Sequence, residues 1–230
     1  MSTFQRARTP EQRAERQRDI LLVAATMLDE MPVSELSLNE LSRRVGLAKS
    51  NVIRYFETRE AVLLELLAQE ARQFLDDLQE SLSADVDSSA PLVDRTRAAA
   101  TCLATTFEAR PTLCELISAQ AGVLEHNVST EVALRYKQSA RENLAGLAEL
   151  LLHQIPELGE DGSARGARLI IVLVGAVWTQ SHPAPTVRDA IETDPSLSFF
   201  LVTFPEALVA SVETFLTGIV ALRTDETVGP

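Results

Sequence analysis

The sequence predicts an all-α protein, and three observations support this fold class. Apolar residues recur at intervals of three and four along most of the 230 residues, which is the period of an amphipathic helix. From residue 91 onward no run of alternating apolar and polar residues indicates a strand, and glycines are few. Capping sequences and prolines divide the chain into about nine helices. We expect an N-terminal three-helix domain over residues 1–59 and a larger helical domain over residues 60–230.

The first helix is expected to begin near Pro10. Thr9 and Gln12 have the spacing of a capping box, and Pro10 occupies the first helical position, where a missing N–H costs nothing. Pro32 ends the helix. Its buried stripe comprises Ile20, Ala24, Met27, Leu28 and Met31.

Residues 37–59, SLNELSRRVGLAKSNVIRYFETR, predict two short helices and the start of another. Ser37 and Glu40 form a second capping box, so a helix begins there. Gly46 supplies the backbone conformation that a helix needs at its C-terminal exit. A second helix over about 48–56 then buries Leu47, Val52, Ile53 and Phe56.

The opposite face of this second helix carries hydrogen-bond donors with almost no acidic partner: Lys49, Ser50, Asn51, Arg54 and Tyr55. Two helices joined by a short glycine turn, the second basic, predict a helix-turn-helix that enters the DNA major groove. Lys donates to guanine and Asn pairs with adenine, so the helix has base-reading chemistry. The alternative is an ordinary helical hairpin with a solvated polar face.

From about residue 19 to residue 67 the sequence resembles the TetR family of transcriptional regulators, most specifically in LSLNELSRRVGLAKSNVIRYFETREAVLLELL. The resemblance implies an all-helical homodimer. It further implies an N-terminal helix-turn-helix domain that binds double-stranded operator DNA, and a C-terminal domain that binds a small effector and dimerises.

The resemblance also implies which residues touch DNA. Lys49, Asn51 and Arg54 would read bases, while Ser37 and Arg59 would contact phosphate. The chain departs from the family at Ile53, where a Tyr is usual, and at Ala48, where Ser or Thr often caps the helix; Ile53 is therefore left out. The complete expected set is Ser37, Asn39, Arg44, Lys49, Ser50, Asn51, Arg54, Tyr55 and Arg59.

Thr58 caps a fourth helix that continues through Leu78 and is broken at residues 83–91. Because this helix begins at a DNA-facing residue and ends in the other domain, movement of its far end would swing the helix-turn-helix. Further helices are expected at roughly 91–109, 111–124, 129–155, 162–181 and 198–222.

Residues 169–178, LIIVLVGAVW, are apolar around the whole circumference of the expected helix. Ten residues cannot span a bilayer, which requires about twenty, so we expect no membrane segment here. A helix of this kind must be buried against its own domain and a partner. With the apolar last helix it predicts a homodimer interface; the alternative is a core within one chain.

The resemblance places an effector pocket between the fourth helix and those that follow it. An aromatic content of 5% favours a pocket lined mainly by aliphatic groups, and hence an apolar or amphipathic effector. The same residues can instead be ordinary core. The candidates are Phe107, Leu113, Leu116, Tyr136, Leu147, Trp178 and His182.

Composition restricts the function further. Residues 1–59 hold ten Lys/Arg and eight Asp/Glu, a net of +2, whereas residues 60–230 hold eleven and twenty-five, a net of −14. Positive charge is thus concentrated beside the helix-turn-helix. Two cysteines, Cys102 and Cys114, and no secretory signal indicate a reduced cytoplasmic setting in which both thiols are buried. The alternative is a redox switch formed by the two thiols.

No HExxH, GxSxG, P-loop or dinucleotide-binding pattern occurs, and the three histidines lack metal-ligand spacing. We therefore expect no enzyme, cofactor or metal site. The sequence predicts a transcriptional regulator, a repressor released from a palindromic operator by its ligand. The alternative is a helical dimeric binding module that acts through a protein partner or small ligand without specific DNA recognition.

Overall fold

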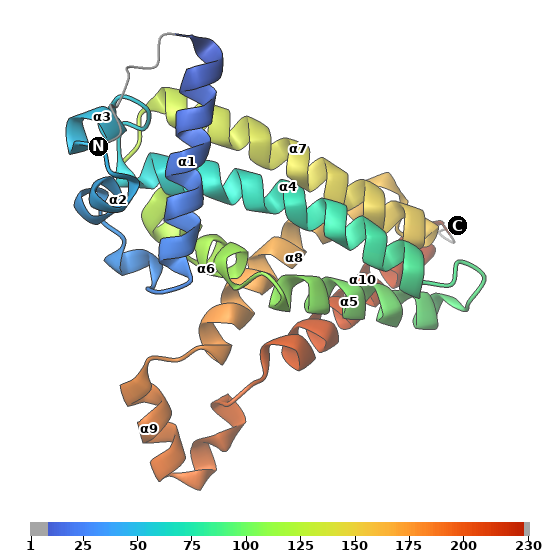
Figure 1. Cartoon of the computed structure of the whole chain (residues 1–230). Coiled ribbons are helices and arrows are strands. Elements are labelled where there is room, and N and C mark those ends of the chain that lie inside the picture. Colours follow the sequence, from blue (N-terminus) through green and yellow to red (C-terminus); the bar gives the residue numbers. More distant parts are fainter. Residues whose placement is uncertain (1–8, 228–230) are drawn as a thin grey trace.

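The computed structural model describes residues 9–227, and within this range it contains ten α-helices and no β-strand (Figure 1). The predicted all-α fold class is confirmed. A small N-terminal head of three helices lies at one end of a larger helical body, and the long helix α4 runs from one into the other (Figure 1).

The head comprises α1 (Pro10–Leu28), α2 (Leu38–Val45) and α3 (Lys49–Ile53), with a 3-10 turn at Val33–Glu35. The N-cap hydrogen bond of each predicted capping box forms: the Thr9 hydroxyl accepts from the Gln12 N–H, and the Ser37 hydroxyl accepts from the Glu40 N–H. The Glu40 carboxylate instead accepts from Arg43 and Arg44. Fully buried side chains from the three helices meet in one core: Ile20, Ala24, Met27, Leu41 and Val52.

Helix α4 (Arg59–Asp85) begins at the Thr58 cap and contacts α1 as well as α5, α6 and α7. The predicted domain boundary at residue 59 therefore coincides with the first residue of one continuous helix. The first turns of α4 carry Ala61, Val62 and Leu64 into the core, so the head is packed against the helix rather than tethered by a linker.

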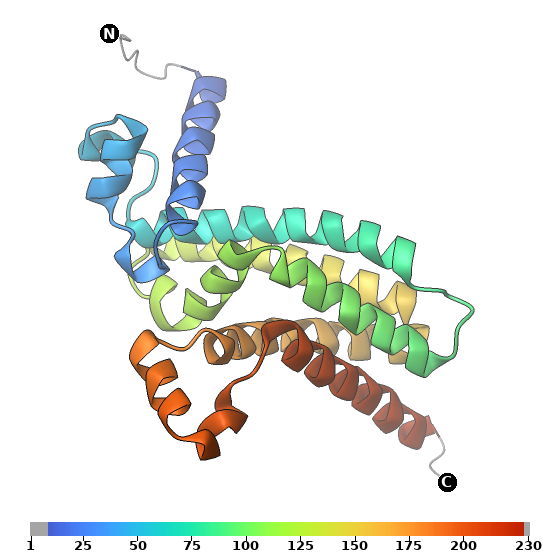
Figure 2. The same ribbon diagram turned by 60° about the horizontal axis from the view of Figure 1, so that its bottom comes forward.

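The body is made by α5 (Leu92–Glu108), α6 (Pro111–Ala119), α7 (Thr130–Gln154), α8 (Gly159–Ser181) and α10 (Phe204–Thr227). Helix α6 continues into a short π-helical segment, Gln120–Leu124. Helices α4 and α7 lie side by side, and α10 packs against α5 and α8 on the opposite side of the body (Figure 2).

The connection between α8 and α10 was not predicted. The sequence pattern predicts no helix between residues 182 and 197, but α9 (Pro185–Thr193) forms there and is followed by a 3-10 helix, Pro195–Phe200. These two elements contact each other and project from the body (Figure 2). Only Ile191 of α9 is buried, so the apolar periodicity that reveals other helices is absent.

The last helix begins at Phe204 rather than at Phe199, with Pro205 in its first turn. Phe199, Phe200 and Leu201 precede it and are 70%, 54% and 47% exposed. Because these three residues are as apolar as the helix that follows, the sequence pattern predicts a start that is too early. The boundary follows from Pro205, because proline favours the first turn of a helix and is excluded from its interior.

By length and composition alone, residues 156–181 and 204–223 would be long and apolar enough to cross a membrane. Core helices of soluble proteins pass the same test. Here α8 packs on α6, α7 and α10, so its composition is that of a helix within a bundle.

Candidate functional site

The turn between α2 and α3 has the geometry that the sequence predicts. Gly46 adopts φ 73°, ψ 28°, the left-handed region, and the Leu47 N–H donates to the Ser42 carbonyl at 2.9 Å. These bonds satisfy the last carbonyls of α2 and redirect the chain sharply. Helix α3 begins at Lys49. Its N-cap residue is Ala48, so no side chain caps the helix, as the departure from the family pattern implies.

One face of α3 is open to solvent. The side chains of Lys49, Ser50, Asn51 and Arg54 are exposed, and within residues 9–227 none of them has a hydrogen bond or ion pair. The neighbouring Tyr55 is half-buried, with the Arg13 guanidinium 5.9 Å from its ring centroid. The structure thus brings the expected base-reading residues together on one surface.

Two other expected DNA contacts are occupied by the protein itself. Arg44 forms ion pairs with Glu30 at 2.6 Å and Glu40 at 2.9 Å. Hydrogen bonds from Arg43 and then Arg44 lower the pKa of the half-buried Glu40 to about 2. A phosphate contact of Arg44 would have to compete with the carboxylates of Glu30 and Glu40.

Arg59 is the clearer departure. Its Nη1 donates to the carbonyls of Ser34 and Leu36 at 3.3 and 3.2 Å, and its Nε donates to Glu60 at 3.2 Å. The side chain is only 21% exposed. Arg59 thus holds the segment before α2 against the start of α4, an anchoring role that sequence reasoning missed.

The remaining members of the set lie at the start of α2. Ser37 is exposed and uses one lone pair for the helix cap, so its hydroxyl hydrogen can still be donated. Asn39 is exposed in the first turn of the same helix.

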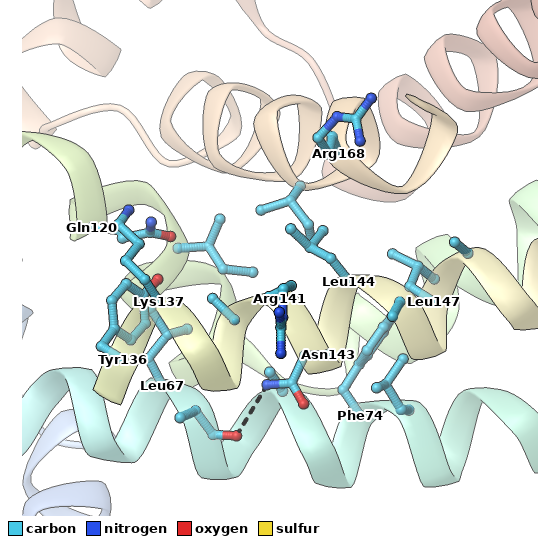
Figure 3. A pocket seen from close by; sticks show the side chains of 18 of the residues that line it. Leu67, Phe74, Gln120, Tyr136, Lys137, Arg141, Asn143, Leu144, Leu147 and Arg168 are labelled. Carbon is cyan, nitrogen blue, oxygen red and sulfur yellow. Dashed lines mark hydrogen bonds between the residues drawn. The ribbon is translucent and has the colours of Figure 1, made fainter. Parts of the chain in front are cut away.

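A cavity of about 520 Å³ lies in the body between α4, α6, α7 and α8 (Figure 3). Of the seven predicted ligand-contacting residues, Tyr136 and Leu147 line it. Most of the other lining side chains are apolar: Leu67, Ala68, Ala71, Phe74, Leu75, Ile117, Ala140, Leu144, Ala145, Ala148, Ala164 and Ile171, with Gln120, Lys137, Arg141, Asn143 and Arg168 as polar members.

The other five predicted residues do not line this cavity. Phe107 is fully buried and stacks on Phe74 with ring centroids 4.0 Å apart, and Leu113 and Leu116 are ordinary core residues. Trp178 and His182 stack on each other at the end of α8, 3.9 Å between centroids. Apolar periodicity identified a buried face in each case but did not distinguish core from cavity wall.

Some polar groups of the cavity are held by the protein. Glu125 accepts from Lys137 at 2.7 Å and from Gln120 at 2.8 Å. Burial alone would raise the pKa of Glu125, but these hydrogen bonds outweigh it and the pKa is lowered. Asn143 donates to the Ala68 carbonyl at 3.4 Å (Figure 3).

Helix α6 connects the cavity wall to the head. Ile117 and Gln120 line the cavity, while on the same helix Glu115 accepts from the Val33 backbone N–H at 3.4 Å and from the Trp178 indole at 3.2 Å. Thr112 also donates to Asp29, at the end of α1. None of these three contacts was predicted, because each joins residues that are far apart in the sequence.

The two cysteines are buried, as expected. Burial raises the pKa of Cys102, and it raises the pKa of Cys114 to about 12. Both thiols are therefore protonated at neutral pH and poorly reactive. Within the described part of the chain no group of three or more His, Cys, Asp or Glu residues is arranged to hold a metal ion.

Comparison with protein families decides the relationship: residues 68–223 match the family described as "Tetracyclin repressor-like, C-terminal domain". The chain belongs to the TetR family of transcriptional regulators. The matched region contains the cavity, α6 and the last helices. The helix-turn-helix lies outside it, so the TetR-type head is supported by the motif and by its geometry.

Solved structures of other bacterial regulators share the fold. One described as a "possible TetR family transcriptional regulator" from Streptomyces coelicolor A3(2) aligns over 90% of this chain and 99% of its own, with a TM-score of 0.56 and 17% identity. The fatty acid degradation regulator FadR from Bacillus halodurans aligns over 87% and 97%, with a TM-score of 0.53 and 17% identity. A comparison with curated protein sequences gives no significant match.

Proposed function

We propose that this TetR-family protein is a cytoplasmic repressor, without enzymatic activity, that binds a palindromic operator as a homodimer and is released by a small effector. The observation that carries the proposal is the exposed face of α3, where Lys49, Asn51 and Arg54 have no protein partner. Hydrogen-bond donors that have no protein partner, on a helix that follows a tight turn, can bond to the edges of bases in the major groove.

The contacts divide by kind. Lys49, Asn51 and Arg54 read bases, with Ser50 and Asn39 beside them. Ser37 and Tyr55 donate to phosphate, and Arg44 contributes positive charge near the backbone. Arg59 acts on DNA binding mainly through the segment it anchors, since its guanidinium is already engaged.

The burial of the last helices supports a homodimer. In the most apolar window of α10 only 22% of residues are buried within one chain, and in that of α8 44% are. Val172 on α8 is 65% exposed. A second copy of these helices would cover this surface and give the two-fold symmetry that a palindromic operator requires.

The cavity and α6 support release by an effector. A ligand that contacts Ile117 and Gln120 presses on the helix whose Glu115 is bonded to the head. Release requires that the ligand bind more tightly to the conformer whose recognition helices no longer match successive major grooves, about 34 Å apart.

One observation favours a second function. Ile53 was expected to be buried, but it is 43% exposed on α3, the helix that carries the proposed base-reading residues. An apolar side chain at this point suits a protein partner better than DNA phosphate. The alternative is therefore a dimeric binding module that acts through a protein partner or small ligand without specific DNA recognition.

The test is selection of bound duplexes from a random DNA pool at moderate salt. We expect the wild type to enrich an inverted repeat and Lys49→Ala to lose preference at specific positions within it. Arg188→Ala is the control, because Arg188 is exposed on α9, far from the head. Failure of the wild type to enrich any repeat would contradict the proposal and favour the protein-partner alternative.

A further inference from the structure

The cavity has an apolar interior of a size suited to a small molecule. Leu67, Phe74, Leu75, Ile117, Leu144 and Ile171 contribute its larger apolar side chains. A volume of about 520 Å³ falls within the range of ordinary ligand sites. These walls favour a hydrocarbon body over a polar or sugar-like one.

The charged groups at the cavity are all of one sign. Lys137, Arg141 and Arg168 line it, and no Asp or Glu does. This is the reverse of the surrounding domain, where residues 60–230 hold twenty-five acidic and eleven basic residues. Because Glu125 pairs with Lys137, the net positive charge resides on the two arginines.

Arg141 and Arg168 are the arginines that both line the cavity and have no carboxylate partner among the described residues; Arg165 and Arg188 are also unpaired but do not line it. Arg95, Arg97 and Arg110 are each paired with a carboxylate, whereas no ion pair or hydrogen bond engages Arg141 or Arg168 within residues 9–227. Both side chains are exposed, Arg141 on α7 and Arg168 on α8, so they lie at the rim of the cavity. Figure 3 shows them on two sides of the apolar lining, with the Arg168 guanidinium directed away from α7.

We propose that the effector of this site is an amphipathic carboxylate, whose hydrocarbon body fills the apolar cavity and whose carboxylate lies at the basic rim that Arg141 and Arg168 form. A guanidinium presents a planar pair of N–H groups that matches the two oxygens of a carboxylate. This inference rests on the proposed effector site, but it concerns the chemistry of the ligand and does not depend on DNA binding.

Calorimetric titration in the absence of DNA tests the proposal. Decanoate and 1-decanol, each below its aggregation limit, serve as probes with the same hydrocarbon chain. We expect decanoate to bind more tightly than decanol. Because both arginines are partly solvated, Arg141→Gln and Arg168→Gln should each weaken decanoate binding about 3- to 10-fold while leaving decanol binding unchanged.

Arg165→Gln is the matched control. Arg165 is exposed on α8, one turn before Arg168, and does not line the cavity, so its substitution should leave both affinities unchanged. Raising the salt concentration from 50 to 500 mM should weaken the binding of decanoate but not of decanol. Retained decanol binding also shows that each variant is folded.

Three results would overturn the proposal: equal affinity for the two probes, unchanged decanoate binding in the Arg141→Gln and Arg168→Gln double variant, or no binding of any carboxylate from eight to fourteen carbons. Operator release is measured separately. Carboxylate binding without release would contradict the proposed repressor mechanism but support the ligand class, whereas operator binding without carboxylate binding would do the opposite.

Discussion

Arg54 and Arg59 are five residues apart, yet their guanidinium groups have different surroundings. That of Arg54 is exposed and has no protein partner, whereas that of Arg59 is bonded to the carbonyls of Ser34 and Leu36. Sequence reasoning gave both of them DNA contacts. The structure separates a side chain that can bind DNA from one that supports the head.

This difference predicts opposite effects for the alanine variants of the two arginines. Arg59→Ala should lower the free energy of unfolding by about 1 to 2 kcal/mol, because two backbone carbonyls lose a charged donor. Arg54→Ala should change it by less than about 0.5 kcal/mol and instead weaken operator binding by about 1 to 3 kcal/mol. Urea denaturation and DNA titration measure the two quantities. Equal stability of the two variants would contradict the anchoring role.

A second residue-scale prediction concerns Gly46. Its φ of 73° lies where a Cβ costs about 1 to 2 kcal/mol. No neighbouring atom lies within 4 Å of a Cβ placed there, so a substitution meets backbone strain alone. Gly46→Ala should therefore destabilise the protein, and Gly46→Asn should do so less, since Asn tolerates this region. Thermal unfolding of the two variants checks this order of stability. Steric crowding would give the reverse order, because Asn is larger than Ala.

At the scale of elements, α6 contacts both the cavity and the head. Because a helix moves largely as a unit, displacement of Ile117 or Gln120 by a ligand would also move Glu115. Helix α4 offers a second route, since it lines the cavity with Leu67 and Phe74 and begins at Arg59.

Substitution of Glu115 distinguishes the two routes. We expect Glu115→Ala to retain the affinity for ligand but to lose most of the ligand-induced fall in operator affinity, which for typical coupling is about 5- to 150-fold. Glu108→Ala, at the exposed end of α5, is the control. Normal release by the Glu115 variant would assign the coupling to α4.

The elements also show how far the sequence determined the fold. The starts of α1, α2, α4 and α7 were predicted closely, because each has a side-chain N-cap that is recognisable in the sequence. These caps are Thr9, Ser37, Thr58 and Ser129. Helix α9 was missed, since it buries only Ile191. The cavity wall was predicted only at Tyr136 and Leu147, because periodicity reveals which face is buried and not whether the space beside it is filled.

At the scale of the whole molecule, α8 and α10 present apolar surface that one chain does not cover. If this surface forms the dimer interface, Val172→Asp should raise the dimer dissociation constant at least 100-fold, because a charge would be buried without a partner. Sedimentation measures the shift. Leu134→Asp is the control, since Leu134 is 58% exposed on α7. A dimer that survives Val172→Asp would place the interface elsewhere.

The distribution of charge is also a property of the whole molecule. A head with a net charge of +2 is joined to a body with −14. The body is repelled by DNA, so encounters that present the head are favoured. Non-specific affinity should accordingly be weak, because few phosphates are neutralised.

Trp178 is the one tryptophan of the chain, and its indole donates to the same Glu115 carboxylate that bonds to the head. The protein therefore contains its own optical reporter at the junction of α6 and α8. Any rearrangement that separates Glu115 from this ring changes the polarity around the indole and shifts its emission. Fluorescence of the unlabelled protein would then follow the switch in real time, and its rate could be compared with that of operator release.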